Sequence, residues 1–402
     1  MITFIDRPCG FGKTTEMLNG LKDDELYLIV VPTLGEVDRC LENKPKNVRL
    51  TTPSEEHGSK SRELERLIKA KENVVCTHSL YHLNSDFYKE GHLDDYNIII
   101  DEVLDVVKTI DGPKPKSWEE FYVDDGYATV DEKGQVHTTA KWDERRSFVD
   151  DTLNNEIYDK ANTGQLFVHS NKFFVWGVSP YLLKSGKTCT VMSFRIEGSL
   201  MQLYLDRIGL PYEIQKYQDE EHAMRESFRD LATVTHVELG AGMSYSKQLS
   251  SLQEGGQLVA SKLRKIKERD KSINKDTKVL LTCAKVLWYG NGWFEEEDKS
   301  KATGVWAKGS RLAEQAVWIA NTTRGTNDYK EIGHAIYLYD QYLNPAVKQW
   351  LGATNKQQDQ YALSELLQWL YRTRLRERKA CTIYIGSKRM KDLLDKWLAG
   401  DL

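Results

Sequence analysis

A short segment near the start of the chain, Arg7–Thr15 with the sequence RPCGFGKTT, has the residue types and spacing that bind phosphate. Its last part, Gly12-Lys13-Thr14, matches the end of the P-loop pattern GxxxxGK(S/T), and Arg7 stands where the pattern has its first glycine. Glycine lets the backbone curl so that successive N–H groups point at phosphate oxygens, and the helix that follows presents its N-terminal end to the same anion. Lys13 would then span the β- and γ-phosphates of a nucleotide while the Thr14 hydroxyl binds Mg²⁺. The alternative interpretation is an ordinary glycine-rich turn between a strand and a helix.

The residues that we predict to line a nucleotide on this loop are consecutive: Arg7, Pro8, Cys9, Gly10, Phe11, Gly12, Lys13, Thr14 and Thr15.

A second chemical signal is the segment NIIIDE, which ends with Asp101 and Glu102. Three β-branched residues favour a buried strand, and in open α/β sheets the carboxyl ends of the strands are where ligands bind. We expect Asp101 to hold Mg²⁺ through water and Glu102 to polarise the water that attacks the γ-phosphorus. A strand that ends in a solvated acidic turn is the alternative. Together the two segments predict nucleoside-triphosphate hydrolysis.

The elements that must position these residues alternate between short apolar runs and helical or polar stretches, which indicates an α/β fold. The runs are continuous rather than alternating, as in strands buried on both faces of a parallel sheet. The predicted strands of the first part are Ile2–Asp6, Leu26–Val31, Val74–Thr77, Asn97–Asp101 and Cys189–Ser193, and the predicted helices are Thr14–Leu21, Leu34–Leu41 and Ser61–Lys71.

Between about 107 and 187 the texture changes to aromatic and turn-rich sequence, with a hairpin expected around Glu132–Gly134, so we interpret this stretch as an insertion in the first domain. A polar helical region then leads into a second α/β unit, which ends in a long C-terminal helical pattern. Its predicted strands are Val279–Cys283, Gln315–Ile319 and Ala335–Tyr339. The predicted domains are therefore 1–215 and 216–402.

Composition limits the class of protein. The chain has 402 residues, 40% of them hydrophobic, which suits two globular domains. A formal net charge of −4 excludes a uniformly basic nucleic-acid-binding coat but permits a local basic groove. The six cysteines are scattered without zinc-binding spacing, and no run approaches the ~18 apolar residues of a membrane span. With no secretory signal ahead of the first strand, we expect a cytoplasmic protein with reduced thiols.

Read in order, the segments of the chain resemble the motif series of superfamily 2 DEAD/DEAH-like helicases and translocases, as found in small bacteriophage-encoded DNA helicases. The matching segments are Gly10–Thr15, Val30-Val31-Pro32-Thr33, Cys76–Leu80, Asp101–Leu104, Val191–Phe194, Thr322–Asn327 and Gln368–Arg376. The resemblance implies two RecA-like parallel-sheet domains in tandem, with ATP and Mg²⁺ in the cleft between them. It implies ATP-dependent movement along nucleic acid or its unwinding, and a bacterial host cytoplasm if the protein is phage-encoded.

The resemblance also assigns nucleic-acid contacts at the ends of strands and in the Thr/Asn-rich segment of the second domain. These residues are Pro32, Thr33, Thr77, His78, Ser79, Thr322, Thr323 and Arg324, with Gly325 facing the nucleotide. Short hydroxyl side chains suit phosphate oxygens, which position a strand without reading its sequence. A structural histidine is an equal alternative for His78. Single-stranded DNA is the favoured partner, and RNA is compatible with the same residues.

Three arginines follow Gln368 in the segment QWLYRTRLR. On a continuous helix, Gln368, Arg372 and Arg376 are spaced i, i+4, i+8 and share one face, whereas Arg374 points about 200° away from Arg372. We therefore predict that these three residues face the nucleotide and that Arg376 is the arginine finger. The alternative is a basic helix exposed to solvent.

Two other functions remain open at this level. One is a P-loop NTPase or kinase acting on a small molecule, which would leave the arginine segment unused. The other is an ATP-binding adaptor with a degenerate core, whose insertion at 107–187 binds a protein partner.

Overall fold

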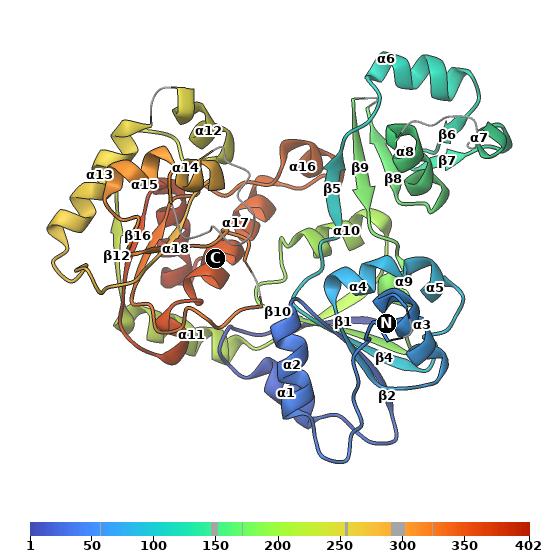
Figure 1. The fold of residues 1–402 in the computed structure, drawn as a ribbon, viewed down its shortest axis with the longest axis horizontal. Helices are drawn as coiled ribbons and strands as arrows, with labels where there is room; N and C mark the ends of the chain where they lie inside the picture. Colours follow the sequence, from blue (N-terminus) through green and yellow to red (C-terminus); the bar gives the residue numbers. More distant parts are fainter. Residues whose placement is uncertain (57, 146–151, 171, 254–255, 291–301, 324) are drawn as a thin grey trace. The chain divides into compact units, whose positions relative to one another are not determined.

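The protein was analysed as a computed structural model, which describes residues 1–402 except 57, 146–151, 171, 254–255, 291–301 and 324. The chain forms two compact units (Figure 1). The first comprises Met1–Asp6, Thr14–Gln215 and Leu343–Gln357, and the second comprises Arg7–Lys13, Lys216–Tyr342 and Gln358–Leu402. Two segments are exchanged between the units. Residues 7–13 belong to the second unit although the chain on either side of them belongs to the first, and residues 343–357 belong to the first unit although their flanking residues belong to the second.

The first unit is built on a six-stranded sheet in the order β11-β1-β10-β4-β2-β3. The pairs from β1 to β3 are parallel, so the carboxyl ends of these strands lie at one edge. Strand β2 shows why the sequence folds this way, because its Val/Ile run is almost wholly buried. The strands are β1 (Ile2–Asp6), β2 (Leu26–Val31), β3 (Val74–Thr77), β4 (Tyr96–Asp101), β10 (Thr188–Ser193) and β11 (Tyr212–Lys216).

The helices around this sheet begin at residues that cap them. Thr33, Ser59, Thr77 and Ser199 each accept a hydrogen bond from the backbone of the first turn that follows. The helices are α1 (Lys13–Asn19), α2 (Leu34–Asn43), α3 (Lys60–Lys69), α4 (His78–Leu83), α5 (Ser85–Lys89), α9 (Tyr181–Lys184) and α10 (Leu200–Ile208).

Between β4 and β10, in the stretch interpreted as an insertion, the chain forms two antiparallel sheets. One sheet has the order β5-β9-β8, and the other is the expected hairpin of β6 and β7. The core of this stretch contains the fully buried Trp118, packed edge-to-face on Phe174. The elements are β5 (Val107–Ile110), α6 (Pro115–Trp118), the π-helix η1 (Glu119–Asp124), β6 (Ala128–Val130), β7 (Val136–Thr138), α7 (Ala140–Arg145), α8 (Thr152–Asn162), β8 (Leu166–His169) and β9 (Phe173–Gly177).

A helix from the C-terminal half of the chain completes the first unit. Helix α16 (Pro345–Leu351) lies beside β5 and α10 (Figure 1). Its Trp350 is 2% exposed, with its ring 4.9 Å from that of Phe167 in β8 and 6.2 Å from that of Tyr204 in α10. The Arg207 guanidinium lies 5.6 Å from the centre of the Trp350 ring. Trp350 is therefore the anchor of this helix.

Replacing this anchor should weaken the first unit. We expect Trp350→Ala to lower its free energy of unfolding by about 3–5 kcal/mol, because a large ring leaves a cavity among aromatic neighbours. Urea unfolding followed by circular dichroism measures this change. Phe121→Ala is the control, because Phe121 is 59% exposed in the insertion. It should change the stability by no more than about 0.5 kcal/mol, and equal effects of the two variants would contradict the anchoring role.

The second unit is built on a five-stranded parallel sheet in the order β12-β16-β15-β13-β14. Its core packs Trp288 and Trp306 against β13 and β15. The strands are β12 (Ala232–His236), β13 (Val279–Thr282), β14 (Ala316–Trp318), β15 (His334–Tyr337) and β16 (Cys381–Ile385). The helices are α11 (Gln218–Leu231), α12 (Tyr245–Gln253), α13 (Gln257–Arg269), α14 (Lys285–Tyr289), α15 (Val305–Ser310), α17 (Asn355–Leu370), the 3-10 helix η4 (Arg374–Glu377) and α18 (Lys388–Ala399).

The prediction of a long helical C-terminus is wrong at β16, which lies in the sheet between β12 and β15. This five-residue strand is bracketed by polar helical sequence, so its β-branched residues were too few to stand out. The six cysteines are all buried and free, as predicted. No described helix combines the length and the apolar composition that crossing a bilayer requires.

Candidate nucleotide and nucleic-acid sites

The phosphate loop connects β1 to α1 and needs its glycines for conformation. Gly10 and Gly12 have φ angles of +85° and +79°, in the left-handed region that other residues rarely adopt. Lys13 begins α1, and its Nζ donates a hydrogen bond of 2.9 Å to the carbonyl oxygen of Arg7 in the same loop. The lysine is thus folded back over the loop, which is where the P-loop pattern requires it.

In the first unit the structure brings the other half of the predicted nucleotide chemistry together. The Thr14 hydroxyl donates a hydrogen bond of 2.9 Å to Oδ2 of Asp101, although 87 residues separate them in sequence. Asp101 ends β4 and is 6% exposed. The residue pair expected to hold Mg²⁺ therefore meets at the carboxyl edge of the sheet.

Glu102 is held in a strained backbone conformation beside this pair. Its φ is +64°, which is uncommon for a residue with a side chain. The Ser193 hydroxyl at the end of β10 donates a hydrogen bond of 2.7 Å to Oε2 of Glu102, and the Glu102 N–H donates to the Met192 carbonyl. Strand β10 neighbours β4, so the next strand of the sheet orients this carboxylate.

The chemistry of the pair suits a hard cation. A hydroxyl and a carboxylate oxygen are ligands of the kind that Mg²⁺ prefers, completed by water and phosphate oxygens. Among the described residues, no group of three or more His, Cys, Asp and Glu side chains could hold a metal by itself. Burial and the nearby Asp101 charge raise the pKa of the Cys40 thiol to about 12, so this thiol stays neutral.

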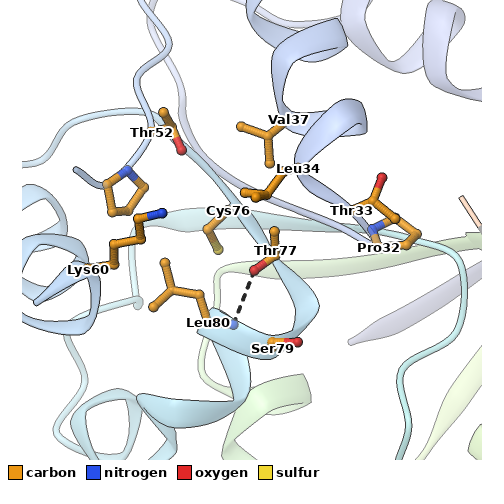
Figure 2. A pocket seen from close by; sticks show the side chains of 11 residues that line it. Pro32, Thr33, Leu34, Val37, Thr52, Lys60, Cys76, Thr77, Ser79 and Leu80 are labelled. Carbon is orange, nitrogen blue, oxygen red and sulfur yellow. Dashed lines mark hydrogen bonds between the residues drawn. The ribbon is translucent and has the colours of Figure 1, made fainter. Parts of the chain in front are cut away.

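A pocket of about 370 Å³ opens at the carboxyl ends of β2 and β3. Figure 2 shows the Lys60 ammonium directed toward the space that Thr52, Cys76 and Leu80 surround. Four of the eleven lining residues are predicted nucleic-acid contacts, namely Pro32, Thr33, Thr77 and Ser79. The others are Leu34, Val37, Thr52, Pro53, Lys60, Cys76 and Leu80.

The hydroxyls of this pocket have defined hydrogen-bonding roles. Thr33 and Thr77 accept from the backbone N–H groups of Glu36 and Leu80, each at 3.3 Å, as the caps of α2 and α4. The Thr77 hydroxyl can in addition donate its own O–H. The pocket therefore presents hydroxyl donors and one ammonium group, which together suit an anionic ligand.

His78 has a different position from its predicted neighbours. Its Nε2 lies 2.9 Å from the carbonyl oxygen of Asp101, which can only accept, so Nε2 carries the proton. His78 is not among the residues that line the pocket. The contact ties the start of α4 to the end of β4, which is a structural role for the imidazole.

In the second unit, the two predicted motifs of the C-terminal half meet. Arg372, which is 5% exposed, donates a hydrogen bond of 3.0 Å to the Thr326 carbonyl. Gly325 has a φ of +67°, so this turn needs glycine. Thr322 is exposed and Thr323 is half-buried. Arg324 lies outside the described residues.

The prediction of one helical stripe through Gln368, Arg372 and Arg376 is wrong, because α17 ends at Leu370. The chain tightens there as Thr373 donates to the Leu370 carbonyl, and Arg376 then lies on η4. Gln368 is 4% exposed and donates to Ser364 on its own helix.

The turn after α17 has a tertiary cause. The backbone N–H of Arg374 donates a hydrogen bond of 3.1 Å to the carbonyl oxygen of Ile332, which is distant in sequence. This hydrogen bond draws the chain out of the helix. The Arg374 guanidinium donates to the Ala380 carbonyl. Arg376 instead lies against the phosphate loop within the second unit, where its carbonyl is 3.6 Å from the position that a Cβ would occupy at Gly10.

Several residues of these sites belong to no sequence motif. Lys60 and Thr52 line the pocket without belonging to any motif, and Glu220 contacts the phosphate loop across 213 residues. A cap signal, Ser59 before a helical pattern, was the one local hint for Lys60. Glu220 had no sequence signal.

Comparisons with known proteins describe the fold rather than an activity. Residues 227–398 match the model of the YonV C-terminal Rossmann-like domain. The chain is 22% identical to the SPbeta prophage-derived uncharacterized protein YonV of Bacillus subtilis strain 168, over 99% of this chain and 98% of that protein.

Among solved structures, apo XPD covers 100% of the chain with 15% identity and a TM-score of 0.53, and the match spans 96% of that structure. Xpd4 of S. tokodaii covers 98% of the chain with 12% identity and a TM-score of 0.50, over 94% of that structure. The chain therefore has a helicase-like fold of two parallel-sheet α/β domains, as in tandem RecA-like proteins, and the predicted fold class is confirmed.

Proposed function

We propose that this protein is an ATP-dependent helicase or translocase that hydrolyses ATP and uses it to move along or unwind nucleic acid. The observation that carries the proposal is the 2.9 Å hydrogen bond between Thr14 and Asp101, which joins the GKT segment to the acidic pair. The alternative interpretations, an ordinary glycine-rich turn and a solvated acidic turn, do not predict this contact. A nucleotide site with bound Mg²⁺ does predict it. The helicase-like fold supports the same conclusion.

The residues divide the work on the triphosphate. Lys13 leaves the Arg7 carbonyl and binds the β- and γ-phosphates, where its charge stabilises the negative charge of the transition state. Thr14 and Asp101 would hold Mg²⁺. When bound, this ion neutralises phosphate charge.

Glu102 accepts the proton of the attacking water, so that ADP and inorganic phosphate form. Its hydrogen bond from Ser193 fixes the direction of the carboxylate before water binds. Arg376 and Arg372 supply positive charge to the phosphate that is being transferred.

The pocket beside β2 and β3 is the proposed site of the nucleic-acid backbone, together with Thr322 and Thr323 of the second unit. The ammonium and hydroxyl groups fit phosphate oxygens. Single-stranded DNA is the proposed partner. The prophage origin of the YonV relative supports a phage-encoded protein that works in the bacterial host cytoplasm.

The experiment that tests the function measures ATP turnover with no nucleic acid, single-stranded DNA, duplex DNA and single-stranded RNA. We expect turnover that a single strand stimulates, with DNA more effective than RNA. Turnover that no nucleic acid changes would favour a small-molecule NTPase. ATP binding without turnover would favour an adaptor that acts through a protein partner on the 107–187 insertion.

Binding to the pocket should depend on salt and on Lys60. Each phosphate neutralised by the protein releases counterions, so affinity for single-stranded DNA should fall as salt rises. We expect Lys60→Ala to weaken binding for all sequences alike and to reduce the slope of log K against log salt by about 1. Lys69→Ala at the other end of α3 is the matched control. Fluorescence anisotropy with labelled single-stranded DNA measures this slope. A slope that is unchanged in Lys60→Ala would show that Lys60 does not contact the nucleic acid.

A further inference from the structure

Within the second unit, an ion pair holds the phosphate loop at Arg7, the position where the P-loop pattern has its first glycine. The Arg7 guanidinium donates from Nε to Oε2 of Glu220 at 2.7 Å and from Nη2 to Oε1 at 2.8 Å. The side chains are 12% and 26% exposed. Two parallel hydrogen bonds of this kind fix orientation as well as distance.

Two further features make this ion pair stiff. Glu220 lies in the first turn of α11, where the helix dipole favours a negative charge. The Arg7 guanidinium also lies 4.9 Å from the centre of the Tyr217 ring, which limits its movement from a second side. Arg7 itself lies outside the left-handed region, so arginine can replace the glycine here without strain.

The same residue controls the position of the catalytic lysine candidate. The carbonyl of Arg7 accepts the hydrogen bond of Lys13, so fixing Arg7 also fixes the point at which Lys13 rests. At the far side of the loop, Gly10 lies against the Arg376 backbone, and the Arg378 guanidinium is 5.9 Å from the centre of the Phe11 ring. The loop is therefore held at its start, Arg7, and in its middle, Gly10 and Phe11, within the second unit.

We propose that Glu220, acting through Arg7, is a positioning residue that pre-forms the phosphate loop for ATP. This inference rests on the proposed function. The ion pair keeps the loop in the conformation that receives phosphate and keeps Lys13 at its resting place beside it. A loop without the ion pair must be ordered by the nucleotide itself, and that cost weakens binding.

The expected signature is a change in nucleotide affinity rather than in the chemical step. Once phosphate occupies the loop, Lys13 bonds to phosphate and no longer to the Arg7 carbonyl. The ion pair therefore matters before binding more than after it. A general loss of structure would lower kcat and the amount of folded protein together, which this mechanism does not predict.

The test compares wild type with Glu220→Gln and Arg7→Lys in the full chain, using a fluorescent ATP analogue for Kd and steady-state turnover for KM and kcat. We expect Kd and KM to rise about tenfold, the loss of one charge-assisted interaction, with kcat within about twofold. Glu226→Gln is the matched control, because Glu226 lies on the same helix and pairs with Arg229 instead of Arg7.

If wild type and Glu220→Gln bind the ATP analogue equally well, the inference about Glu220 is wrong and the proposed function still stands. A fall in kcat with KM unchanged would also overturn the inference, since that outcome assigns the ion pair to chemistry or to folding. Failure of wild type itself to bind the analogue would overturn the proposed function, and the inference with it. Thermal melting of each variant verifies that the compared proteins are folded.

Discussion

Lys13→Ala is expected to lower kcat/KM for ATP hydrolysis by about 10²–10³-fold, because it removes the one ammonium group that the phosphate loop aims at the β- and γ-phosphates. In the present structure the Lys13 Nζ is 2.9 Å from the Arg7 carbonyl, so the side chain is already at the loop that receives phosphate. The loss should appear in kcat as well as in KM, since charge builds up on the phosphate in the transition state.

The matched control for this prediction is Lys22→Ala, the same substitution at a lysine beyond the end of α1. Lys22 is exposed and belongs to none of the predicted sites. Its variant should keep turnover within about twofold to threefold of wild type, which is the range of a surface substitution. Persistent hydrolysis by Lys13→Ala, or equal losses in both variants, would contradict the assignment of the loop.

Arg376→Ala is expected to reduce kcat by about 10³–10⁵-fold while nucleotide binding is largely kept, as for the loss of an arginine finger. The arginine lies on η4, with its backbone against Gly10 of the phosphate loop in the second unit. A guanidinium that contacts the phosphate only as charge develops contributes to the transition state more than to the ground state. Single-turnover kinetics with saturating ATP separate this effect from binding.

Arg374→Ala tests the specificity of that assignment. Its guanidinium is bonded to the Ala380 carbonyl and lies against Gly333, so its removal should lower thermal stability while kcat changes little. Rapid hydrolysis by Arg376→Ala together with a large loss in Arg374→Ala would reverse the roles. Arg372 is buried and bonded to Thr326, so its alanine variant should affect both stability and turnover.

Local pattern predicted the parts of the site that depend on neighbours in sequence. The strands β1, β2, β3, β4 and β10 lie within a residue of their predicted bounds, because buried parallel strands leave continuous apolar runs. Gly10 and Gly12 adopt the positive φ that the loop needed. The hairpin of β6 and β7 was predicted from the turn residues around Glu132–Gly134, within the aromatic and turn-rich stretch that we interpreted as an insertion.

The path of the arginine segment depends on tertiary contacts. Spacing alone placed Gln368, Arg372 and Arg376 on one helical face. The helix stops at Leu370 because Thr373 and a backbone hydrogen bond to Ile332 draw the chain away. The spacing of residues along a helix carries no information about Ile332, the hydrogen-bond partner on a distant loop.

The amino-acid sequence by itself determined that this is an α/β protein with a phosphate loop after its first strand and an acidic pair after a later one. Only the tertiary structure decided that Thr14 meets Asp101, that Ser193 orients Glu102, and that Glu220 holds Arg7. Periodicity and glycine placement act over a few residues, so they can be read along the chain. Contacts between side chains that are 87 to 213 residues apart depend on strand order and packing, which no local pattern encodes.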